Sequence, residues 1–389
     1  MSVATIILHK HKAEAVRRFH PWIFSGAIKK IDGAVNDGDV VSVEDERGSL
    51  LGVGHYAKGS IAVRLFSFQK IESVEQCFTE KIEQAIVLRK AIGMWSNKRT
   101  NAFRLIHGEG DGLPGLIIDV YNTTAVLQAH STGMFKERKL IAGLLVKLSG
   151  GRITTVYDKS SAALHAHTKD EILIGENVST EIVENGNRFQ VDVIGGQKTG
   201  FFLDQRENRK LLGKFSKDRN VLNTFCYTGG FSVYALKAGA AEVHSVDASA
   251  KAMAITDANI ALNELQNHQS FALDVFEFMK EAKNDFYNTI VLDPPAFAKH
   301  HSARHQAIQA YKRLNAVAFQ KVSKGGMVFT FSCSQAVNSA LFEGAVTAGA
   351  IEAKRNIKVI HRVTQPADHP VNIFHPEGEY LKGLLLWVE

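Results

Sequence analysis

A cysteine and an aspartate each follow an apolar stretch that is typical of a β-strand. Cys333 lies at the end of "FTFSCS" (329–334), and Asp293 precedes two prolines in "LDPPAF" (292–297). In open α/β sheets ligands bind beyond the carboxyl ends of the strands, so both groups could face one pocket. A thiolate there could add to carbon 6 of a pyrimidine and make carbon 5 nucleophilic, while the acid stabilises the ring when its nitrogen 3 takes up a proton. Cysteine is also a common small packing residue, and the stretch alone favours neither role.

A glycine pair lies in the turn "NTFCYTGGFS" (223–232), between a predicted strand and a predicted helix. The turn has neither the GxGxxG pattern of dinucleotide sites nor the lysine of a P-loop, which bind phosphate groups. Asp247 follows Gly229 by 18 residues, as does the acid that binds a ribose hydroxyl in nucleotide-binding βαβ units. This combination favours a cofactor that has adenosine but no phosphate, such as S-adenosylmethionine.

The elements that must position these residues fall into three predicted domains. Residues 1–72 alternate apolar and polar residues between turns, which predicts a compact all-β binding module. Residues 73–190 combine helical spacing with strands and predict an α+β domain. Residues 191–389 alternate strand and helix, which predicts a parallel sheet with crossovers. The expected fold class is α/β.

Composition narrows the class of protein further. The net charge of +6 leans weakly toward an acidic partner such as nucleic acid. The three cysteines are far apart and predict neither a disulfide framework nor a CxxC metal pair, so a reducing cytoplasm is expected, with Cys77 and Cys226 as packing residues. We expect no membrane partner, because no apolar run approaches the ~20 residues that cross a bilayer. The histidines show no local ligand spacing, and the sequence predicts no metal.

Seven segments, in this order, resemble the ribosomal large-subunit RNA cytosine-5 methyltransferases that carry an N-terminal PUA domain. They are "HPWIFSGAI", "DGLPGLIIDVY", "QKTGFFLDQRENR", "NTFCYTGGFSVYAL", "VLDPPAFAK", "FTFSCS" and "DHPV…HPEGEYLKG". The resemblance implies a PUA-like RNA-binding domain (1–72), a central α+β domain (73–190) and a Rossmann-like methyltransferase domain (191–389). It also implies that the protein uses S-adenosylmethionine to form 5-methylcytosine in 23S ribosomal RNA, and it makes a homodimer an expectation to test.

The same resemblance, carried over position by position, implies the residues of the site. Cys333 is the nucleophile and Asp293 the second catalytic residue. The cofactor residues are Asp204, Gln205, Arg206, Thr224, Phe225, Tyr227, Thr228, Gly229, Asp247, Ala248, Asp274, Val275 and Asp293. The substrate residues are Pro294, Pro295, Phe297 and Lys299.

One position departs from the pattern of the wider cytosine-5 RNA methyltransferases. Many of them have a second cysteine after the prolines that helps to release the product, whereas this chain has Ala296. The base that removes the carbon-5 proton therefore stays open between Lys299 and a water held by Asp293.

Two other functions remain compatible with the sequence. An acid, two prolines and an aromatic residue also suit methylation of an exocyclic amino group, which needs no thiol. A protein of another class, an RNA-binding scaffold without catalysis, would keep the N-terminal module but would not bind S-adenosylmethionine.

Overall fold

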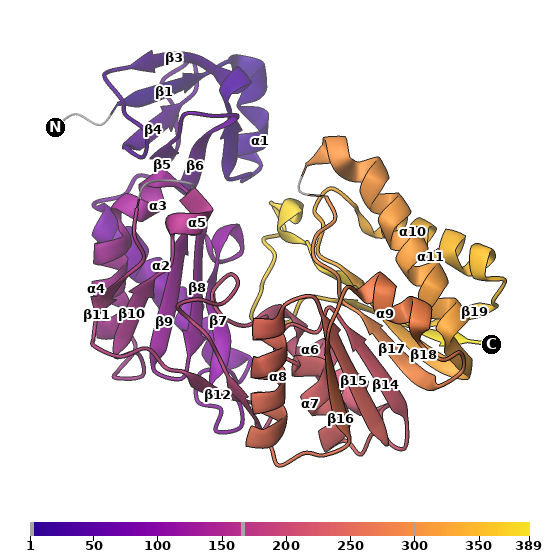
Figure 1. The fold of residues 1–389 in the computed structure, drawn as a ribbon. Coiled ribbons are helices and arrows are strands. Elements are labelled where there is room, and N and C mark those ends of the chain that lie inside the picture. Colours follow the sequence, from indigo (N-terminus) through magenta and orange to yellow (C-terminus); the bar gives the residue numbers. More distant parts are fainter. Residues whose placement is uncertain (1–3, 165–167, 299) are drawn as a thin grey trace. The chain divides into compact units, whose positions relative to one another are not determined.

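The computed structural model describes residues 4–164, 168–298 and 300–389 (Figure 1). Contacts divide the chain into two compact units. The first contains residues 1–182, 191–203 and 367–378, and the second contains residues 183–190, 204–366 and 379–389. The boundaries predicted after residues 72 and 190 stay predictions. The structure adds that residues 367–378, near the C-terminus, belong to the first unit.

The N-terminal part of the first unit is a six-stranded sheet in the order β2-β6-β5-β4-β1-β3. Its strands are β1 (Thr5–Leu8), β2 (Trp22–Phe24), β3 (Ile28–Asp32), β4 (Val40–Glu44), β5 (Leu50–Tyr56) and β6 (Ile61–Ser67). The alternating apolar residues of β1 and β4 point into one core, as the sequence predicted. The expectation of an all-β module was wrong in one detail. A short helix, α1 (Glu14–Arg17), follows the first strand, where alanine, glutamate and arginine favour helix.

A second sheet of the first unit has five strands in the order β11-β10-β9-β8-β7. The strands are β7 (Ala102–His107), β8 (Leu116–Tyr121), β9 (Thr124–Ala129), β10 (Thr155–Asp158) and β11 (Glu171–Ile174). The helices are α2 (Val74–Ala91), α3 (Thr132–Lys136), α4 (Arg138–Leu148) and α5 (Ser161–Leu164). Phe66 of β6 packs on Phe78 of α2 with 5.3 Å between ring centroids, so the two sheets share one apolar core. Cys77 is buried in that core, in its expected packing role.

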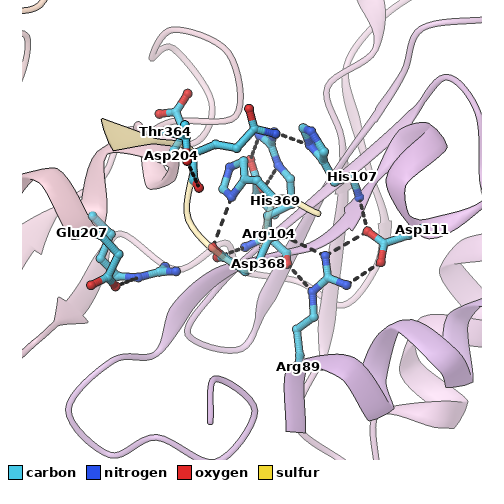
Figure 2. A network of polar contacts seen from close by, with 12 residues as sticks. Arg89, Arg104, His107, Asp111, Asp204, Glu207, Thr364, Asp368 and His369 are labelled. Carbon is cyan, nitrogen blue, oxygen red and sulfur yellow. Dashed lines mark hydrogen bonds and ion pairs between the residues drawn. The ribbon is translucent and has the colours of Figure 1, made fainter. Parts of the chain in front are cut away.

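Residues 367–378 are held to this part of the first unit by a buried arginine (Figure 2). Arg89 of α2 has no exposed surface and makes a two-pronged ion pair with Asp111, with N–O distances of 2.5 and 2.9 Å. The Arg89 guanidinium also donates to the backbone oxygens of Asp368 (2.9 Å) and Arg104 (2.8 Å). Arg104 N–H donates to the carboxylate of Asp368 at 3.0 Å, so this segment is bound through its backbone and a side chain.

Residues 367–378 approach the loop "HGEGDGLPG" (107–115) so closely that only glycine fits at position 110. A Cβ atom on Gly110 would lie 1.9 Å from the backbone oxygen of Pro370. Gly110 lies in the 3-10 turn η3 (Gly108–Asp111), so the "HGEGDGLPG" loop serves as a packing surface for the returning chain as well as a tight turn.

The second unit is built on a seven-stranded sheet in the order β16-β15-β14-β17-β18-β20-β19. The strands are β14 (Asn220–Thr224), β15 (Glu242–Asp247), β16 (His268–Ala272), β17 (Tyr287–Leu292), β18 (Val322–Ser332), β19 (Ile357–Thr364) and β20 (Lys382–Val388). The five strands from β14 to β18 are parallel, while β20 runs antiparallel to both β18 and β19. A hairpin of β12 (Glu181–Glu184) and β13 (Asn187–Gln190) precedes the sheet.

The helices of the second unit are α6 (Arg206–Gly213), α7 (Gly230–Lys237), α8 (Ala250–Leu262), α9 (Val275–Glu281), α10 (Arg304–Lys321) and α11 (Ser339–Ala353). The chain leaves β14 toward β15 and β16, and then returns to the other side of β14 to form β17 and β18. The winding direction reverses there, and the carboxyl ends of β14 and β17 are therefore the point at which open α/β sheets bind ligands. Within the described residues, no helix is long and apolar enough to cross a membrane.

Candidate active site

The residues predicted to do chemistry follow the carboxyl ends of neighbouring strands. Thr224, the last residue of β14, is in register with Val246 of β15 and with Leu292 of β17. Leu292 is in turn in register with Thr330 of β18. The turn 225–229 and Asp293 directly follow β14 and β17, Asp247 is the last residue of β15, and Cys333 follows Ser332 at the end of β18. All four therefore lie at one edge of the sheet.

The turn between β14 and α7 has an unusual backbone. Phe225 and Tyr227 adopt φ values of 52° and 48°, a left-handed conformation that costs L-residues about 1–2 kcal/mol each. Gly229 has φ 75°, and a Cβ atom there would lie 2.6 Å from Thr256 Cγ2, so only glycine fits. Two side chains of α8 fix the turn: Thr256 donates to the Tyr227 oxygen at 3.0 Å, and Asn259 donates to the Thr228 oxygen at 2.9 Å. Strain that surrounding contacts hold in place is typical of ligand-binding turns.

Asp247 ties this turn to the end of β15. Its carboxylate accepts one backbone N–H from Tyr227 (3.0 Å) and one from Ser249 (2.9 Å), each on a different oxygen. A carboxylate oxygen has two lone pairs, so each oxygen can accept a further hydrogen bond, as a ribose diol requires. The carboxylate is half-buried, and the neighbouring Ala248 is exposed.

Asp274 follows β16 and caps the next helix. Its Oδ1 accepts the backbone N–H groups of Phe276 (2.9 Å) and Glu277 (3.2 Å) at the start of α9. The side chain is exposed, and its second carboxylate oxygen can accept a hydrogen bond from an amino group. Val275 is buried in the core beneath it. A structural cap and a ligand contact are therefore compatible in one residue.

Asp293 lies directly after β17 and bonds to the segment "LDQR". Gln205 donates to Asp293 Oδ1 at 2.9 Å and accepts a hydrogen bond from Asn208 at 2.6 Å. Asp204 is buried and accepts a hydrogen bond from the Tyr380 hydroxyl at 2.7 Å. Arg206 is buried as well. The structure thus joins Gln205 to Asp293, and Gln205 is buried like Asp204 and Arg206. The cofactor roles of these three residues stay predictions.

Cys333 is half-buried and follows the last residue of β18. The two serines that flank it are fully buried and share one partner. Ser332 donates to the Tyr311 hydroxyl at 2.8 Å, and Ser334 is 3.1 Å from the same oxygen. Ser334 also accepts the Ala298 N–H at 3.3 Å. The serines therefore fix the backbone on both sides of the thiol.

A buried lysine that the sequence reasoning did not single out lies beside Cys333. Lys382 of β20 is in register with Ser332, and its ammonium donates to the backbone oxygens of Ser334 (2.8 Å) and Val337 (2.6 Å). Burial lowers the pKa of Lys382, and the proximity of Cys333 opposes this effect. An ammonium has three N–H groups, and these two bonds leave one for a further acceptor. The only sequence signal was its place in "HPEGEYLKG".

The predicted substrate residues differ in exposure. Pro294 is buried, Pro295 is exposed, and Phe297 is half-buried against the Tyr311 ring with 4.8 Å between centroids. Lys299 lies outside the described residues. Cys226, next to the turn, is buried 3.9 Å from the Met253 sulfur, and burial raises the pKa of its thiol, in keeping with its expected packing role.

A buried ion pair supports the turn and was not foreseen from the sequence. Arg209 of α6 bonds both carboxylate oxygens of Glu184 at 2.8 and 2.7 Å, and both side chains are buried. Tyr234 of α7 donates to the same carboxylate at 3.0 Å. A Cβ atom on Gly230 would lie 3.0 Å from the Arg209 side chain, so the second glycine of the pair makes room for this arginine.

Comparison with known proteins identifies the family. A family model described as S-adenosylmethionine-dependent methyltransferase matches residues 156–385, and a PUA-like domain matches residues 6–68. A "Ribosomal RNA large subunit methyltransferase I" from Tolumonas auensis is 38% identical over 395 residues, covering 98% of each chain. The protein of the same name from Alteromonas mediterranea is 38% identical over 393 residues, again with 98% of each chain covered. The chain belongs to this methyltransferase family.

The fold of these methyltransferases is confirmed by solved structures. A Streptococcus mutans chain described as SAM-dependent methyltransferase matches with a TM-score of 0.85 at 23% identity, over 100% of both chains. A methyltransferase solved in complex with S-adenosylhomocysteine (SAH) matches with a TM-score of 0.86 at 24% identity, over 100% of both chains. The predicted PUA-like domain and the Rossmann-like methyltransferase fold are therefore confirmed, and the enzyme is an S-adenosylmethionine-dependent methyltransferase.

Proposed function

We propose that this methyltransferase converts cytosine to 5-methylcytosine in 23S ribosomal RNA, with Cys333 as the covalent nucleophile. The observation that carries the proposal is the position of Cys333 and Asp293 at the ends of adjacent parallel strands, β18 and β17. The strained turn that fits an adenosine cofactor lies at the next strand end of the same edge. Methylation of an exocyclic amine would use the acid and the prolines but would leave the thiol without a role.

The residues of this edge fit S-adenosylmethionine in their donors and acceptors. Asp247 offers two carboxylate oxygens to the ribose, and Asp274 offers one oxygen to the adenine amino group. Gly229 lets the turn 225–229 pack closely against Thr256 of α8. S-adenosylmethionine supplies an electrophilic methyl group on a sulfonium. Gln205 holds Asp293 in place through a hydrogen bond of 2.9 Å. In the proposed complex the cytosine ring binds next to Asp293.

The proposed reaction starts when Cys333 Sγ adds to carbon 6 of cytosine, which makes carbon 5 nucleophilic. Asp293 stabilises the adduct as nitrogen 3 takes up a proton. After carbon 5 has gained the methyl group it loses its proton to a base and the Cys333–carbon 6 bond breaks, which restores the ring double bond and the thiolate. Nitrogen 3 then gives up the proton that it had taken up. Ala296 cannot supply the thiol that many related enzymes use in this last step, so a water at Asp293, or Lys299, serves as the base.

Lys382 places a positive charge near the thiol of Cys333. Only a thiolate is nucleophilic enough, and a cation close to the sulfur stabilises that form. The two hydrogen bonds of Lys382 to backbone oxygens hold its ammonium near the thiol while the chain bends away from β18. Lys382 acts through Cys333 and is a positioning residue.

The PUA-like domain is the proposed contact to ribosomal RNA. It carries exposed cations on its surface, among them Lys10, Lys12 and Arg18. A cytoplasmic location would give the enzyme access to ribosomal RNA. A homodimer is the expected assembly, and light scattering of the purified protein measures it. Incubation of total ribosomal RNA with labelled S-adenosylmethionine, followed by nucleoside analysis, tests the product.

We expect Asp247→Ala to weaken S-adenosylmethionine binding by about 1–3 kcal/mol, because the ribose loses a charged acceptor. The turn also loses its bond from Tyr227 N–H to the carboxylate. Isothermal titration calorimetry measures the affinity. Glu281→Ala, which removes an exposed acid at the end of α9, is the matched control and should bind as the wild type does. Equal affinities of the two variants would remove Asp247 from the cofactor site.

RNA binding by the intact protein should fall steeply with added salt, because contacts to phosphates release counterions. Deleting the PUA-like domain would open the core that Phe66 and Phe78 share, so point substitutions are the cleaner test. The triple variant Lys10→Ala, Lys12→Ala, Arg18→Ala should bind RNA more weakly and with a shallower salt dependence. Its affinity for S-adenosylmethionine should not change. Unchanged RNA affinity would place the phosphate contacts elsewhere.

A further inference from the structure

Two histidines and a glutamate from opposite ends of the sequence lie together in the first unit. They are His20, just before β2, and His375 and Glu377 in the returning segment 367–378. Each side chain offers one ligand atom, and these atoms all lie within 4.8 Å of one another. His20 Nε2 is 3.5 Å from one oxygen of Glu377, and His375 Nε2 is 3.8 Å from the other.

His375 is buried in a way that packing alone does not explain. Its side chain is only 3% exposed, and in the described part of the chain neither ring nitrogen has a hydrogen-bond partner. The ring packs against Trp22 with 4.4 Å between centroids, a contact that a phenylalanine could also make. An unsatisfied buried polar group is costly, and an ion or a water usually accounts for it.

The geometry and the charge both suit a metal ion. Ligands at about 2.0–2.1 Å around a tetrahedral zinc are separated by roughly 3.3–3.5 Å. The three ligand atoms here lie within 4.8 Å of one another, so small shifts of the side chains would bring them to that spacing. The two imidazoles offer neutral nitrogen ligands, and the carboxylate of Glu377 offers a negatively charged oxygen. The Glu377 side chain is 52% exposed, which gives an ion a path from solvent.

We propose that His20, His375 and Glu377 form a binding site for a divalent transition metal ion, with Zn²⁺ as the preferred ion and water as its fourth ligand. Two imidazoles and a carboxylate select Zn²⁺ over Mg²⁺ and Ca²⁺, which prefer oxygen ligands alone. The site joins "HPWIFSGAI" to "HPEGEYLKG", whose first residues are His20 and His375. The ion fastens the returning segment to the edge strand β2 within the first unit.

The ring of His20 is already oriented for such a role. Its Nδ1 accepts the Trp22 backbone N–H at 3.2 Å and lies 3.3 Å from the Trp22 backbone oxygen, so Nε2 is the ring nitrogen on the side of Glu377. Binding of the ion to Nε2 selects the tautomer in which Nδ1–H donates to the Trp22 oxygen. Trp22 is itself held by a 2.8 Å bond from its Nε1 to Glu109. The outer contacts therefore fix one ligand before the ion arrives.

The test is a metal titration of the full-length protein, purified without a histidine tag and freed of metal with a chelator. We expect one Zn²⁺ per chain, measured by calorimetry and by competition with a zinc-binding dye, and a raised unfolding midpoint on binding. Co²⁺ in place of Zn²⁺ should give the visible absorption of a tetrahedral site. Mg²⁺ should not compete.

Three variants assign the site. His375→Ala, His20→Ala and Glu377→Gln should each weaken Zn²⁺ binding at least about 100-fold, since even changes outside the ligand shell cost 10–100-fold. Glu377→Gln keeps the shape of a half-exposed side chain, so it separates loss of the ligand from loss of the fold. His11→Ala is the control for surface histidines, because His11 is exposed and stacks on His9. Absence of Zn²⁺ binding by the wild type, or equal binding by all variants, would overturn the proposal and leave His375 bonded to water.

Discussion

Cys333→Ala should abolish methylation of ribosomal RNA while S-adenosylmethionine still binds. The proposed cofactor residues belong to other strand ends, so removing the thiol leaves their contacts intact. Cys333→Ser should be almost as inactive, because a hydroxyl at neutral pH is a far weaker nucleophile than a partly ionised thiol. Single-turnover methyl transfer measures the reaction, and calorimetry measures cofactor binding.

A mechanism-based substrate makes this test decisive. RNA with 5-fluorocytosine at the target should become covalently linked to the wild type, because fluorine cannot leave as a proton does. Neither Cys333 variant should form the adduct. Cys226→Ala is the matched control, since its sulfur is buried beside Met253, and it should form the adduct normally. Robust turnover by Cys333→Ala would rule out the covalent mechanism and favour methylation of an amino group.

Arg89→Met should lower the free energy of unfolding of the first unit by about 3–5 kcal/mol, the usual result of leaving a buried charge without its partner. The substitution removes four hydrogen bonds and strands the carboxylate of Asp111, which is almost fully buried (Figure 2). Denaturant unfolding followed by tryptophan fluorescence measures the change. With Trp387 replaced by phenylalanine, the signal comes from Trp22 and Trp95, both in the first unit.

Two controls separate charge from packing. The double variant Arg89→Met, Asp111→Leu should regain part of the lost stability, because it leaves no unpaired charge. Lys136→Met breaks an exposed ion pair with Asp39 in the same unit and should change stability little. If Arg89→Met were as stable as Lys136→Met, the network would not anchor residues 367–378.

The grouping of the candidate site residues at one edge of the sheet could be predicted because its signals are local. Strand, turn and acid follow one another within about thirty residues around Gly229, and the ends of parallel strands must meet at one edge. Cys333 and Asp293 could be placed together for the same reason, although their roles stay proposals. The sequence predicted Asp274 as a cofactor ligand but did not predict that its side chain caps the N-terminus of α9. The stretch "DVFE" is compatible with such a cap but does not require one.

The remaining features depend on contacts between distant segments, which no local pattern encodes. Lys382 lies beside Cys333 only because β20 is antiparallel to β18 and pairs with it in one register. Glu184 meets Arg209 through a hairpin that precedes the sheet. The absence of local histidine spacing argued against a metal, but His20 and His375 come together by the return of the chain, which spacing cannot reveal.

The return of residues 367–378 to the first unit has a consequence for synthesis. Arg89 and Asp368 are 279 positions apart, yet they are hydrogen-bonded in one buried network. A growing chain emerges N-terminus first and tends to fold domain by domain, so the first unit must wait for almost the whole second unit to be translated before its last contacts form. Contacts of such high sequence separation also slow folding. A nascent chain stalled before residue 367 would therefore carry an N-terminal half without the bond from Arg104 N–H to Asp368 and with an uncovered turn at Gly110, and would be a substrate for chaperones and proteases.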